Sequence, residues 1–447
     1  MASANPTTLS KSYAAVRQSD DASFNTTLLL VAGIILLLIV WVKSRTTAEF
    51  LTDPITVAYS IFVTTFQLSR LISALFYPTF SKAVTSSIPP SVIANYEPTV
   101  SFVVPCKNEE GAIRNTVEQC FAANYPKEKL EVIVINDGST DRTGEILDEL
   151  KQEYPRLIVV HWAKNRGKRH GMAEGFKRAA GEIVVQLDSD SYIDPQTFRN
   201  IIIPFANPKI GGVCAHADPQ NADKNWLTRM QAAYYFMSFR ILKAAESAYG
   251  MVFCCSGCSS AYRRSAVMPI LDKWLNEQFL GLPVTWGDDR GITNWVLRQG
   301  YQTIYTDQTQ AYTIVPENLN IFIKQQLRWK KGWFVNSIFA SKFVIKKDPF
   351  VAFTYFFPLM FVTLMTPFMA TRAFIYTPIV MGTSAVAYYL IGVLLVASII
   401  TVFYRIVSRN NRYWPYLLIW AAINMLILSF LLFFALAGIQ NRKWSTR

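Results

Sequence analysis

The residues of this chain that are best placed for chemistry are aspartates that follow Val- and Ile-rich segments. Asp188-Ser189-Asp190 comes directly after one such segment. Two carboxylates at positions i and i+2 can present oxygens to a hard divalent cation that is shared with a diphosphate; a solvated acidic turn is the alternative. Asp137 ends an earlier segment and could accept hydrogen bonds from a nucleobase or ribose, or belong to a turn before Gly138. These positions predict a nucleotide site with a metal, with structural turns as the competing hypothesis.

Two further motifs suit the transfer of a group to a hydroxyl. In the Gly-Asp-Asp-Arg motif at 287–290, a carboxylate in a cleft could take the proton from an attacking hydroxyl. Arg290 could instead pair with the motif in a structural ion pair. The Gly-Lys-Arg-His motif at 167–170 puts two cations at the start of a predicted helix, which is a typical anion site. A solvated basic turn is the alternative there.

A third motif combines an aromatic and a cationic side chain. Gln325, Arg328 and Trp329 lie in a Gln-Gln-Leu-Arg-Trp motif, followed by two lysines and a second tryptophan. A sugar ring can stack on the indole while the guanidinium binds a phosphate or a sugar hydroxyl. The motif comes shortly before an apolar segment, so it also fits an amphipathic helix at a membrane surface. Both interpretations can hold together.

The segments that must position these motifs are predicted to form an α/β sheet. Short Val- and Ile-rich runs at 99–105, 130–135, 157–162 and 182–187 alternate with amphipathic stretches at 112–121 and 144–153. Strand alternating with helix predicts a doubly wound sheet, whose ligand crevice lies beyond the carboxyl ends of the strands. The acidic motifs follow the runs at that edge. The sequence contains neither the G-x-G-x-x-G pattern of dinucleotide sites nor the Walker pattern of P-loops.

Composition places the rest of the chain in or near a membrane. The 447 residues are 51% hydrophobic and only 17% charged, with a mean hydropathy of +0.20. This excludes a wholly soluble enzyme, a disordered chain and a small disulfide-stapled domain. The apolar excess lies at the two ends, at 22–42, 54–77, 350–371, 373–404 and 413–439. The first run has about the length needed to cross ~30 Å of hydrocarbon.

Charge, cysteine content and the number of apolar segments add further expectations. The net charge of +13 is compatible with nucleic acid, but next to apolar spans it predicts a basic face near anionic lipid headgroups and a cationic pocket for a phosphorylated substrate. We therefore expect no nucleic-acid partner. The six cysteines show no zinc-site spacing, which predicts free thiols in a reducing compartment. The last apolar segment, 413–439, is expected to bend back or to be re-entrant, so that the C-terminus returns to the cytosolic side.

The order and spacing of the motifs along one chain resemble the processive membrane glycosyltransferases of family 2, above all hyaluronan synthases and rhizobial chitin-oligosaccharide synthases. The resemblance covers essentially the whole chain. It includes a Cys-Ser-Gly motif at 255–257 and a C-terminal Trp-Ser-Thr-Arg at 444–447, which is similar to the gating tail of hyaluronan synthases. Departures occur at Cys258-Ser259, at Ser445 and at 330–333. The departures at 258–259 and 330–333 concern the acceptor side and therefore bear on the product more than on the reaction.

The resemblance implies a GT-A-like α/β domain inserted between N- and C-terminal transmembrane helices. The implied segments are a cytosolic N-terminus (1–25), two transmembrane helices (26–77), the glycosyltransferase domain (97–315), interfacial helices (316–348), C-terminal transmembrane segments (349–439) and a tail (440–447). The implied roles are UDP binding for Asp137, Lys168, Asp188 and Arg328; Mg²⁺ or Mn²⁺ ligation for Asp190; general-base catalysis for Asp289; acceptor or channel contacts for Cys255, Gln325 and Trp329; and gating for Trp444 and Arg447.

The implied function is processive, inverting polymerisation of UDP-sugars by a multi-pass plasma-membrane enzyme whose site faces the cytoplasm. Its partners are UDP-sugar donors, the growing polysaccharide and the lipid bilayer. The run at 279–281 and the tail favour a hyaluronan-type product from UDP-N-acetylglucosamine and UDP-glucuronate. The alternatives are a chitin-type or other β-glycan made from one UDP-sugar, a non-processive transferase acting on a lipid carrier, and a transporter with a degenerate nucleotide sensor. The intact motif carboxylates argue against the last.

Overall fold

The computed structural model describes residues 37, 41, 53–86, 88–381, 384–408 and 411–440. The N-terminal segment 1–25, the first predicted span apart from the helical residues Leu37 and Trp41, and the tail with Trp444 and Arg447 lie outside the described residues. The chain divides into two compact units. One comprises Met1–Thr65 with Thr366–Leu426, and the other comprises Phe66–Met365 with Ile427–Arg447.

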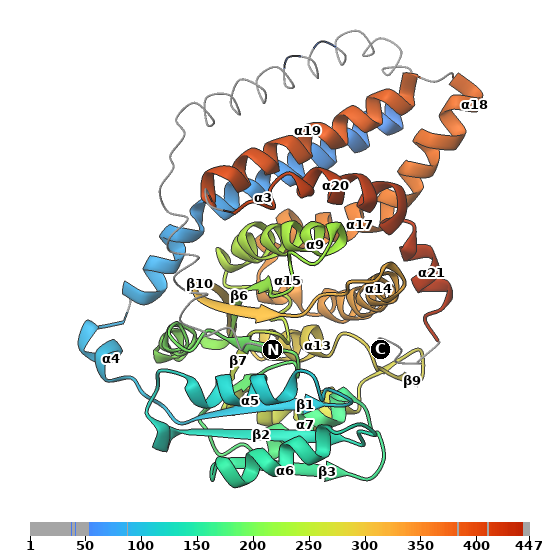
Figure 1. Cartoon of the computed structure of the whole chain (residues 1–447). Helices are drawn as coiled ribbons and strands as arrows, with labels where there is room; N and C mark the ends of the chain where they lie inside the picture. Colours follow the sequence, from blue (N-terminus) through green and yellow to red (C-terminus); the bar gives the residue numbers. More distant parts are fainter. Residues whose placement is uncertain are drawn as a thin grey trace. The chain divides into compact units, whose positions relative to one another are not determined.

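The second unit contains an eight-stranded mixed sheet (Figure 1). Its order is β3-β2-β1-β4-β7-β6-β10-β5, with β3 to β4 all parallel, β10 parallel to β6, and β7 and β5 antiparallel to their neighbours. The strands are β1 (Val100–Cys106), β2 (Leu130–Asp137), β3 (Leu157–Trp162), β4 (Ile183–Gln186), β5 (Ser191–Ile193), β6 (Ile210–Pro219), β7 (Ser260–Arg263) and β10 (Gln302–Thr313). The four predicted runs correspond to β1–β4, whereas β5, β6, β7 and β10 were not predicted.

Helices cover the parallel half of the sheet at close range. They are α5 (Ile113–Ala122), α6 (Thr143–Glu153) and α7 (Lys168–Arg178). Glycines let α7 approach β1, because a Cβ on Gly175 would lie 2.2 Å from Val103 Cγ1 and one on Gly171 would lie 3.0 Å from Pro105 Cβ. Strand β1 is buried along its whole length, as a parallel strand covered on both faces should be. The start of α7, with Lys168, is therefore fixed relative to the carboxyl ends of the strands.

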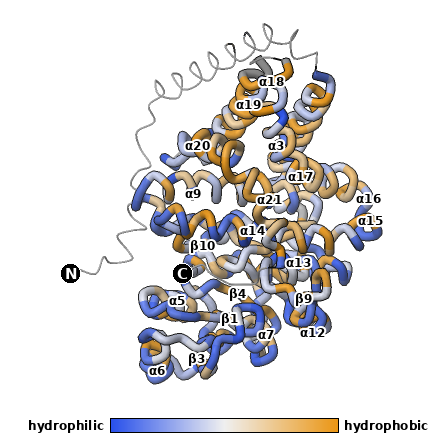
Figure 2. The backbone as a smooth tube through the Cα atoms, turned by 90° about the vertical axis from the view of Figure 1, so that its right-hand side faces the viewer, coloured by the Kyte–Doolittle hydropathy of each residue, from blue (hydrophilic) through white to orange (hydrophobic). Residues whose placement is uncertain are grey.

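The described apolar segments form helices, which Figure 2 colours largely as hydrophobic. Within the described residues, three helices are long and apolar enough to cross a membrane, at Pro54–Ser81, Pro349–Val380 and Tyr389–Val407. The pair Tyr416–Leu428 and Leu431–Ala437, bent by 42°, would make a fourth if it forms one span. The bend lies inside the segment predicted to turn back, and the re-entrant path itself stays a prediction.

The predicted boundary between apolar segments at Arg372 is wrong. The helix continues through a π-helical turn, η6 (Arg372–Tyr376), into α18 (Thr377–Met381). The charge is tolerated inside the apolar helix because Asp53, which lies within the same unit, accepts two hydrogen bonds from the guanidinium, both at 2.9 Å. The predicted free thiols agree with the structure, in which all six cysteines are unpaired.

Candidate active site

Asp137, at the end of β2, organises the loop that leads into α7. Its two carboxylate oxygens accept the N–H groups of Arg166 at 2.6 Å and Gly167 at 2.8 Å. Gly138 follows in a left-handed conformation, and a Cβ there would lie 2.7 Å from the backbone nitrogen of Asn165. The carboxylate is buried and already engaged by the backbone, so its first role is to hold this loop against β2.

Lys168 and Asp188 meet in an ion pair across the carboxyl ends of the strands. Lys168 is the first residue of α7, and Asp188 follows β4. Burial opposes the charged form of Lys168, but the nearby carboxylates of Asp188 and then Asp289 outweigh it and raise the pKa of the ammonium above its usual value. The predicted anion-binding cation is therefore firmly charged and lies beside the predicted metal motif.

Asp190 lies two residues beyond Asp188, next to the short strand β5. Ser191 Oγ lies 3.2 Å from Asp190 Oδ1 and 2.8 Å from Thr313 Oγ1 on β10, which ties the motif to the sheet. In the part of the chain that the structure describes, no three His, Cys, Asp or Glu side chains are grouped closely enough to hold a metal. A divalent cation at the Asp-x-Asp motif would therefore have few protein ligands and need oxygens from a substrate and water, which suits a hard ion shared with a diphosphate.

Asp289 faces the same space from helix α13 (Asp288–Arg298). Its Oδ2 accepts the backbone N–H of Gly257 at 2.9 Å, and its Oδ1 accepts the side-chain amide of Gln186 at 3.3 Å. Burial raises the pKa of Asp289 above its usual value; Lys168 opposes the rise, whereas the nearby negative charges add to it. A partly exposed carboxylate that is held by two donors and has a raised pKa is suited to accept a proton.

The neighbouring Asp288 instead forms a buried ion pair that stabilises the fold. Its Oδ1 accepts a hydrogen bond from Arg169 Nε at 2.8 Å, and the two side chains are only 3% and 5% exposed. The same guanidinium donates to the backbone oxygen of Trp274 at 3.1 Å. The ion pair that the sequence left open at this motif is thus made between Asp288 and Arg169, and Asp289 is the carboxylate left for chemistry.

Gly257 lies at the centre of the acidic cluster. A Cβ at this position would lie 2.8 Å from Asp289 Oδ1, 2.8 Å from Gln186 Nε2 and 2.9 Å from Asp188 Oδ1. The backbone therefore passes directly between the two carboxylates, and only glycine leaves room for both. Cys255 is fully buried, and its backbone N–H donates to Thr293 Oγ1 at 3.0 Å. The structure does not support an acceptor-lining role for its thiol.

The Gln-Gln-Leu-Arg-Trp motif lies on helix α14 (Leu319–Ser341), which packs against α13 through two glycines. A Cβ on Gly332 would lie 2.8 Å from the Cα of Gly287, the left-handed residue that precedes α13. Asn336 Nδ2 donates to the backbone oxygens of Gly332 at 2.9 Å and Gly287 at 3.3 Å. The departure from the family pattern at 330–333 therefore places a glycine where α14 contacts the Gly-Asp-Asp motif.

The side chains of the motif face the acidic cluster and an aromatic pair. Burial lowers the pKa of the Arg328 guanidinium, and Asp188 is the first of four nearby aspartates that oppose this. Trp329 is 36% exposed, and its ring centroid lies 6.4 Å from that of Tyr234 on α9 (Trp226–Met237). Gln325 Oε1 is buried without a hydrogen-bond partner, so it could accept one from a sugar hydroxyl. We call Trp329, Tyr234 and the adjacent Tyr235 the aromatic platform.

The structure thus brings together Lys168, Asp188, Asp289 and Arg328, with Trp329 on the same helix as Arg328. Sequence reasoning missed Gln186, the pairing partner of Asp288, and the two tyrosines of the platform. The tyrosines could have been noticed as an adjacent aromatic pair in a helical stretch. Gln186 and the partner of Asp288 could not be found in this way, because their roles depend on contacts between segments far apart in the chain.

Comparison with known proteins identifies the family. The model of glycosyl transferase family 2 matches residues 101–271. Over 356 residues the chain is 30% identical to an N-acetylglucosaminyltransferase of Azorhizobium caulinodans, covering 78% of this chain and 87% of the relative. The chain belongs to glycosyltransferase family 2. This family 2 glycosyltransferase is also 31% identical over 361 residues to a hyaluronan synthase of Streptococcus pyogenes, with 78% and 83% of the two chains covered.

The fold of this family 2 glycosyltransferase is also found in a solved structure. The mannosyltransferase PcManGT from Pyrobaculum calidifontis, in complex with GDP-Man and Mn²⁺, matches with a TM-score of 0.51 and 20% identity, over 83% of this chain and 99% of that one. The predicted GT-A-like α/β fold, the family and the enzyme class, a hexosyltransferase, are confirmed.

Proposed function

We propose that this family 2 glycosyltransferase is a processive, inverting β-glycan synthase of the hyaluronan type. It would polymerise N-acetylglucosamine and glucuronate from their UDP-sugars and export the product through its own apolar helices. The observation that carries the proposal is the placement of Asp188 and Asp289 on either side of Gly257, with the platform beside Arg328. Such an arrangement offers a donor side and an acceptor side next to each other.

In this proposal Asp289 is the general base. It takes the proton from the acceptor hydroxyl as the oxygen of that hydroxyl bonds to the anomeric carbon from the side opposite the diphosphate. The bond from the anomeric carbon to the phosphate oxygen breaks, and UDP leaves with the electron pair. The hydrogen bonds from Gly257 and Gln186 hold the carboxylate in one orientation. Its raised pKa makes it a stronger base than an exposed aspartate.

The donor side is proposed from the charged groups around Asp188. Lys168 and Arg328 would bind the diphosphate, because each is a partly exposed cation near the acidic cluster. Asp137 would hold the uridine next to the loop that it fixes. Asp190 would ligate Mg²⁺ or Mn²⁺, which when bound neutralises charge on the departing diphosphate.

The acceptor side is proposed from the platform and Gln325. Aromatic rings can carry a sugar by stacking regardless of which hydroxyls it presents, which suits a chain that must advance after each addition. The helix that carries Trp329 is followed in sequence by the candidate span Pro349–Val380. A transferase that adds one sugar to a lipid carrier would have less need for such a platform, and this favours processivity.

Gating by Trp444 and Arg447 is proposed from where the described chain ends. Helix α21 (Leu431–Ala437) packs against α14, and Gln440 lines a small crevice with Trp286, the residue before the Gly-Asp-Asp motif. Gln440, the last described residue, therefore lies close to the Gly-Asp-Asp motif of the proposed site. A site that binds UDP-sugars is expected to face the cytoplasm, where the donors are made, with the apolar helices in the plasma membrane.

One assay separates the candidate functions. The purified full chain in lipid nanodiscs is given Mg²⁺ or Mn²⁺ with UDP-N-acetylglucosamine alone, UDP-glucuronate alone, or both, and UDP release and product length are measured. The proposal expects fast release and a long, polydisperse product only with both donors. Polymer from one donor would establish the chitin-type alternative, and a single added sugar the non-processive one. Absence of UDP release with every UDP-hexose would overturn all three.

A further inference from the structure

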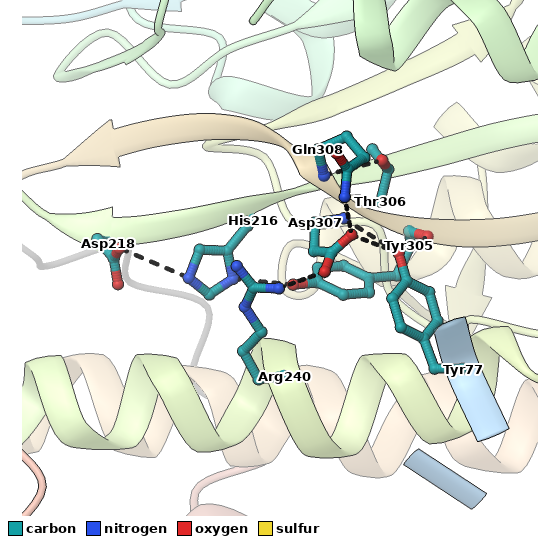
Figure 3. A network of polar contacts seen from close by, with 8 residues as sticks. All are labelled: Tyr77, His216, Asp218, Arg240, Tyr305, Thr306, Asp307 and Gln308. Carbon is teal, nitrogen blue, oxygen red and sulfur yellow. Dashed lines mark hydrogen bonds and ion pairs between the residues drawn. The ribbon is translucent and has the colours of Figure 1, made fainter. Parts of the chain in front are cut away.

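A polar network in the second unit joins an apolar helix to the helix that carries Tyr234 and Tyr235 of the platform (Figure 3). Arg240 pairs with Asp307 on β10, and the hydroxyl of Tyr77 on α3 (Pro54–Ser86) lies 3.2 Å from the same carboxylate. The backbone N–H of Asp307 donates to the Tyr77 hydroxyl at 3.1 Å, and the rings of Tyr77 and Tyr305 lie 5.2 Å apart. We call Tyr77, Arg240 and Asp307 the joint.

The joint forms where two regular elements are interrupted. The ladder between β10 and β6 shifts register between Thr306 and Gln310, so Asp307 lies on a bulge. Facing it, the helix that starts as α9 passes into a π-helical segment, η3 (Ser238–Lys243), which presents Arg240. Bulges re-aim side chains, and π-helical turns are frequent at functional sites. The bulge and the π-helical segment each position one partner of the Arg240–Asp307 ion pair.

A second set of polar contacts links strands β10 and β6 next to the joint. The hydroxyl of Tyr305 lies 2.9 Å from His216 Nδ1, and His216 Nε2 lies 3.5 Å from Asp218 Oδ2 near the end of β6. Gln310 Nε2 donates to the same Asp218 oxygen at 3.1 Å. Tyr305 and His216 are almost completely buried, so β10 and β6 give the joint a rigid base.

The helix that carries Arg240 also carries the two tyrosines of the platform. Tyr235 precedes Arg240 by five residues, or about 8 Å along a helix, and contacts it through Phe239, whose ring centroid lies 6.0 Å from that of Tyr235. Phe239 in turn lies 6.3 Å from Tyr305. A displacement of Arg240 would therefore be passed to Tyr234 and Tyr235, because one rigid helix connects them.

We propose that the joint couples the apolar helix α3 to the platform, and that Tyr77, Asp307 and Arg240 are positioning residues that set how well the growing chain is held. This rests on the proposed processive function. The joint touches none of Lys168, Asp188 or Asp289, so its loss should weaken retention of the acceptor without changing donor binding. It would therefore control product length more than the rate of UDP release.

The test compares Tyr77→Phe with Tyr125→Phe in the full-length enzyme in nanodiscs. Each removes one buried hydroxyl, and among the described residues the Tyr125 hydroxyl donates to the backbone oxygen of Pro98 alone, at 2.7 Å and away from the joint. Tyr77→Phe should shorten the mean product about fivefold, the factor equivalent to one net hydrogen bond. The donor KM and kcat for UDP release should stay within about twofold, and Tyr125→Phe should leave product length unchanged.

Asp307→Asn should reproduce the shortening, and the double variant with Tyr77→Phe should be no worse than the more affected single one, because both act on one unit. Equal product lengths for wild type and Tyr77→Phe, or a parallel fall of kcat and thermal stability in all variants, would overturn the proposal. If the wild type adds only one sugar, the processive function fails by itself. The joint would then still predict a raised acceptor KM at an unchanged donor KM, and an unchanged acceptor KM would refute it.

Discussion

Replacing Gly257 by alanine should disable the site while leaving the fold intact. The backbone of Gly257 is not in the left-handed region, so alanine can adopt it without strain. The added Cβ would lie 2.8 Å from Asp289 Oδ1, so the carboxylate must move by about 0.6 Å to reach ordinary van der Waals contact. The same methyl group would displace Gln186 and Asp188 by similar amounts.

Gly257→Ala is expected to lower kcat more than it lowers stability. A misplacement of about 1 Å can cost on the order of 10²-fold in rate, so we expect kcat to fall by roughly 10- to 100-fold. Overpacking of this kind costs about 1–3 kcal/mol in stability, which a domain of this size should survive. The assay is UDP release at saturating donors, with thermal unfolding measured on the same preparation.

Gly111→Ala is the matched control, because a Cβ there meets nothing within 4 Å. It should keep wild-type kcat. If Gly257→Ala also keeps wild-type kcat at an unchanged unfolding temperature, the two carboxylates do not need their present positions for turnover, and the reasoning from this backbone contact is refuted.

Three further predictions concern single side chains. Asp288→Asn should lower the free energy of unfolding by about 2 kcal/mol, because it removes the charge from the shorter of the two ion pairs of the buried Arg169 and leaves Glu277, at 3.6 Å, as the charged partner; an unchanged denaturation midpoint would contradict this. Burial lowers the pKa of Lys330 to about 8. Since the unfolded chain keeps this proton up to about 10.5, stability should rise with pH between these values. Lys330→Met should therefore stabilise the protein most at pH 7 and least near pH 10, and a gain that is constant with pH would refute this. Asp190→Asn should raise the Mn²⁺ concentration for half-maximal activity about tenfold or more, and an unchanged metal titration would exclude Asp190 as a ligand.

Much of the parallel half of the sheet could be predicted because its strands are continuous Val- and Ile-rich runs. Strand β10 escaped prediction, since its Thr- and Gln-rich sequence has no such run, and β7 is only four residues long. The break predicted at Arg372 was wrong because the residue that neutralises it, Asp53, lies 319 positions away. Local sequence cannot reveal such a partner.

The functional site was also predictable only where local sequence determines it. The acidic and aromatic motifs were predictable from residue type and spacing, because each chemistry needs those groups. Which carboxylate of the Gly-Asp-Asp motif is available was not, since Arg169 selects Asp288 through a contact between distant segments. The roles of Gly257 and Gly332 were likewise not predictable, because each glycine leaves room for a segment that is distant in the sequence.

The most direct measurement of the central claim pairs UDP release with UDP binding in Asp289→Asn. The substitution keeps the size of the side chain and removes its negative charge, its capacity to accept the proton and one of the two hydrogen bonds that it accepts. We expect turnover with UDP-N-acetylglucosamine and UDP-glucuronate to fall by about 10²-fold or more, with an unchanged Kd for UDP by calorimetry. Wild-type turnover in this variant would contradict the account.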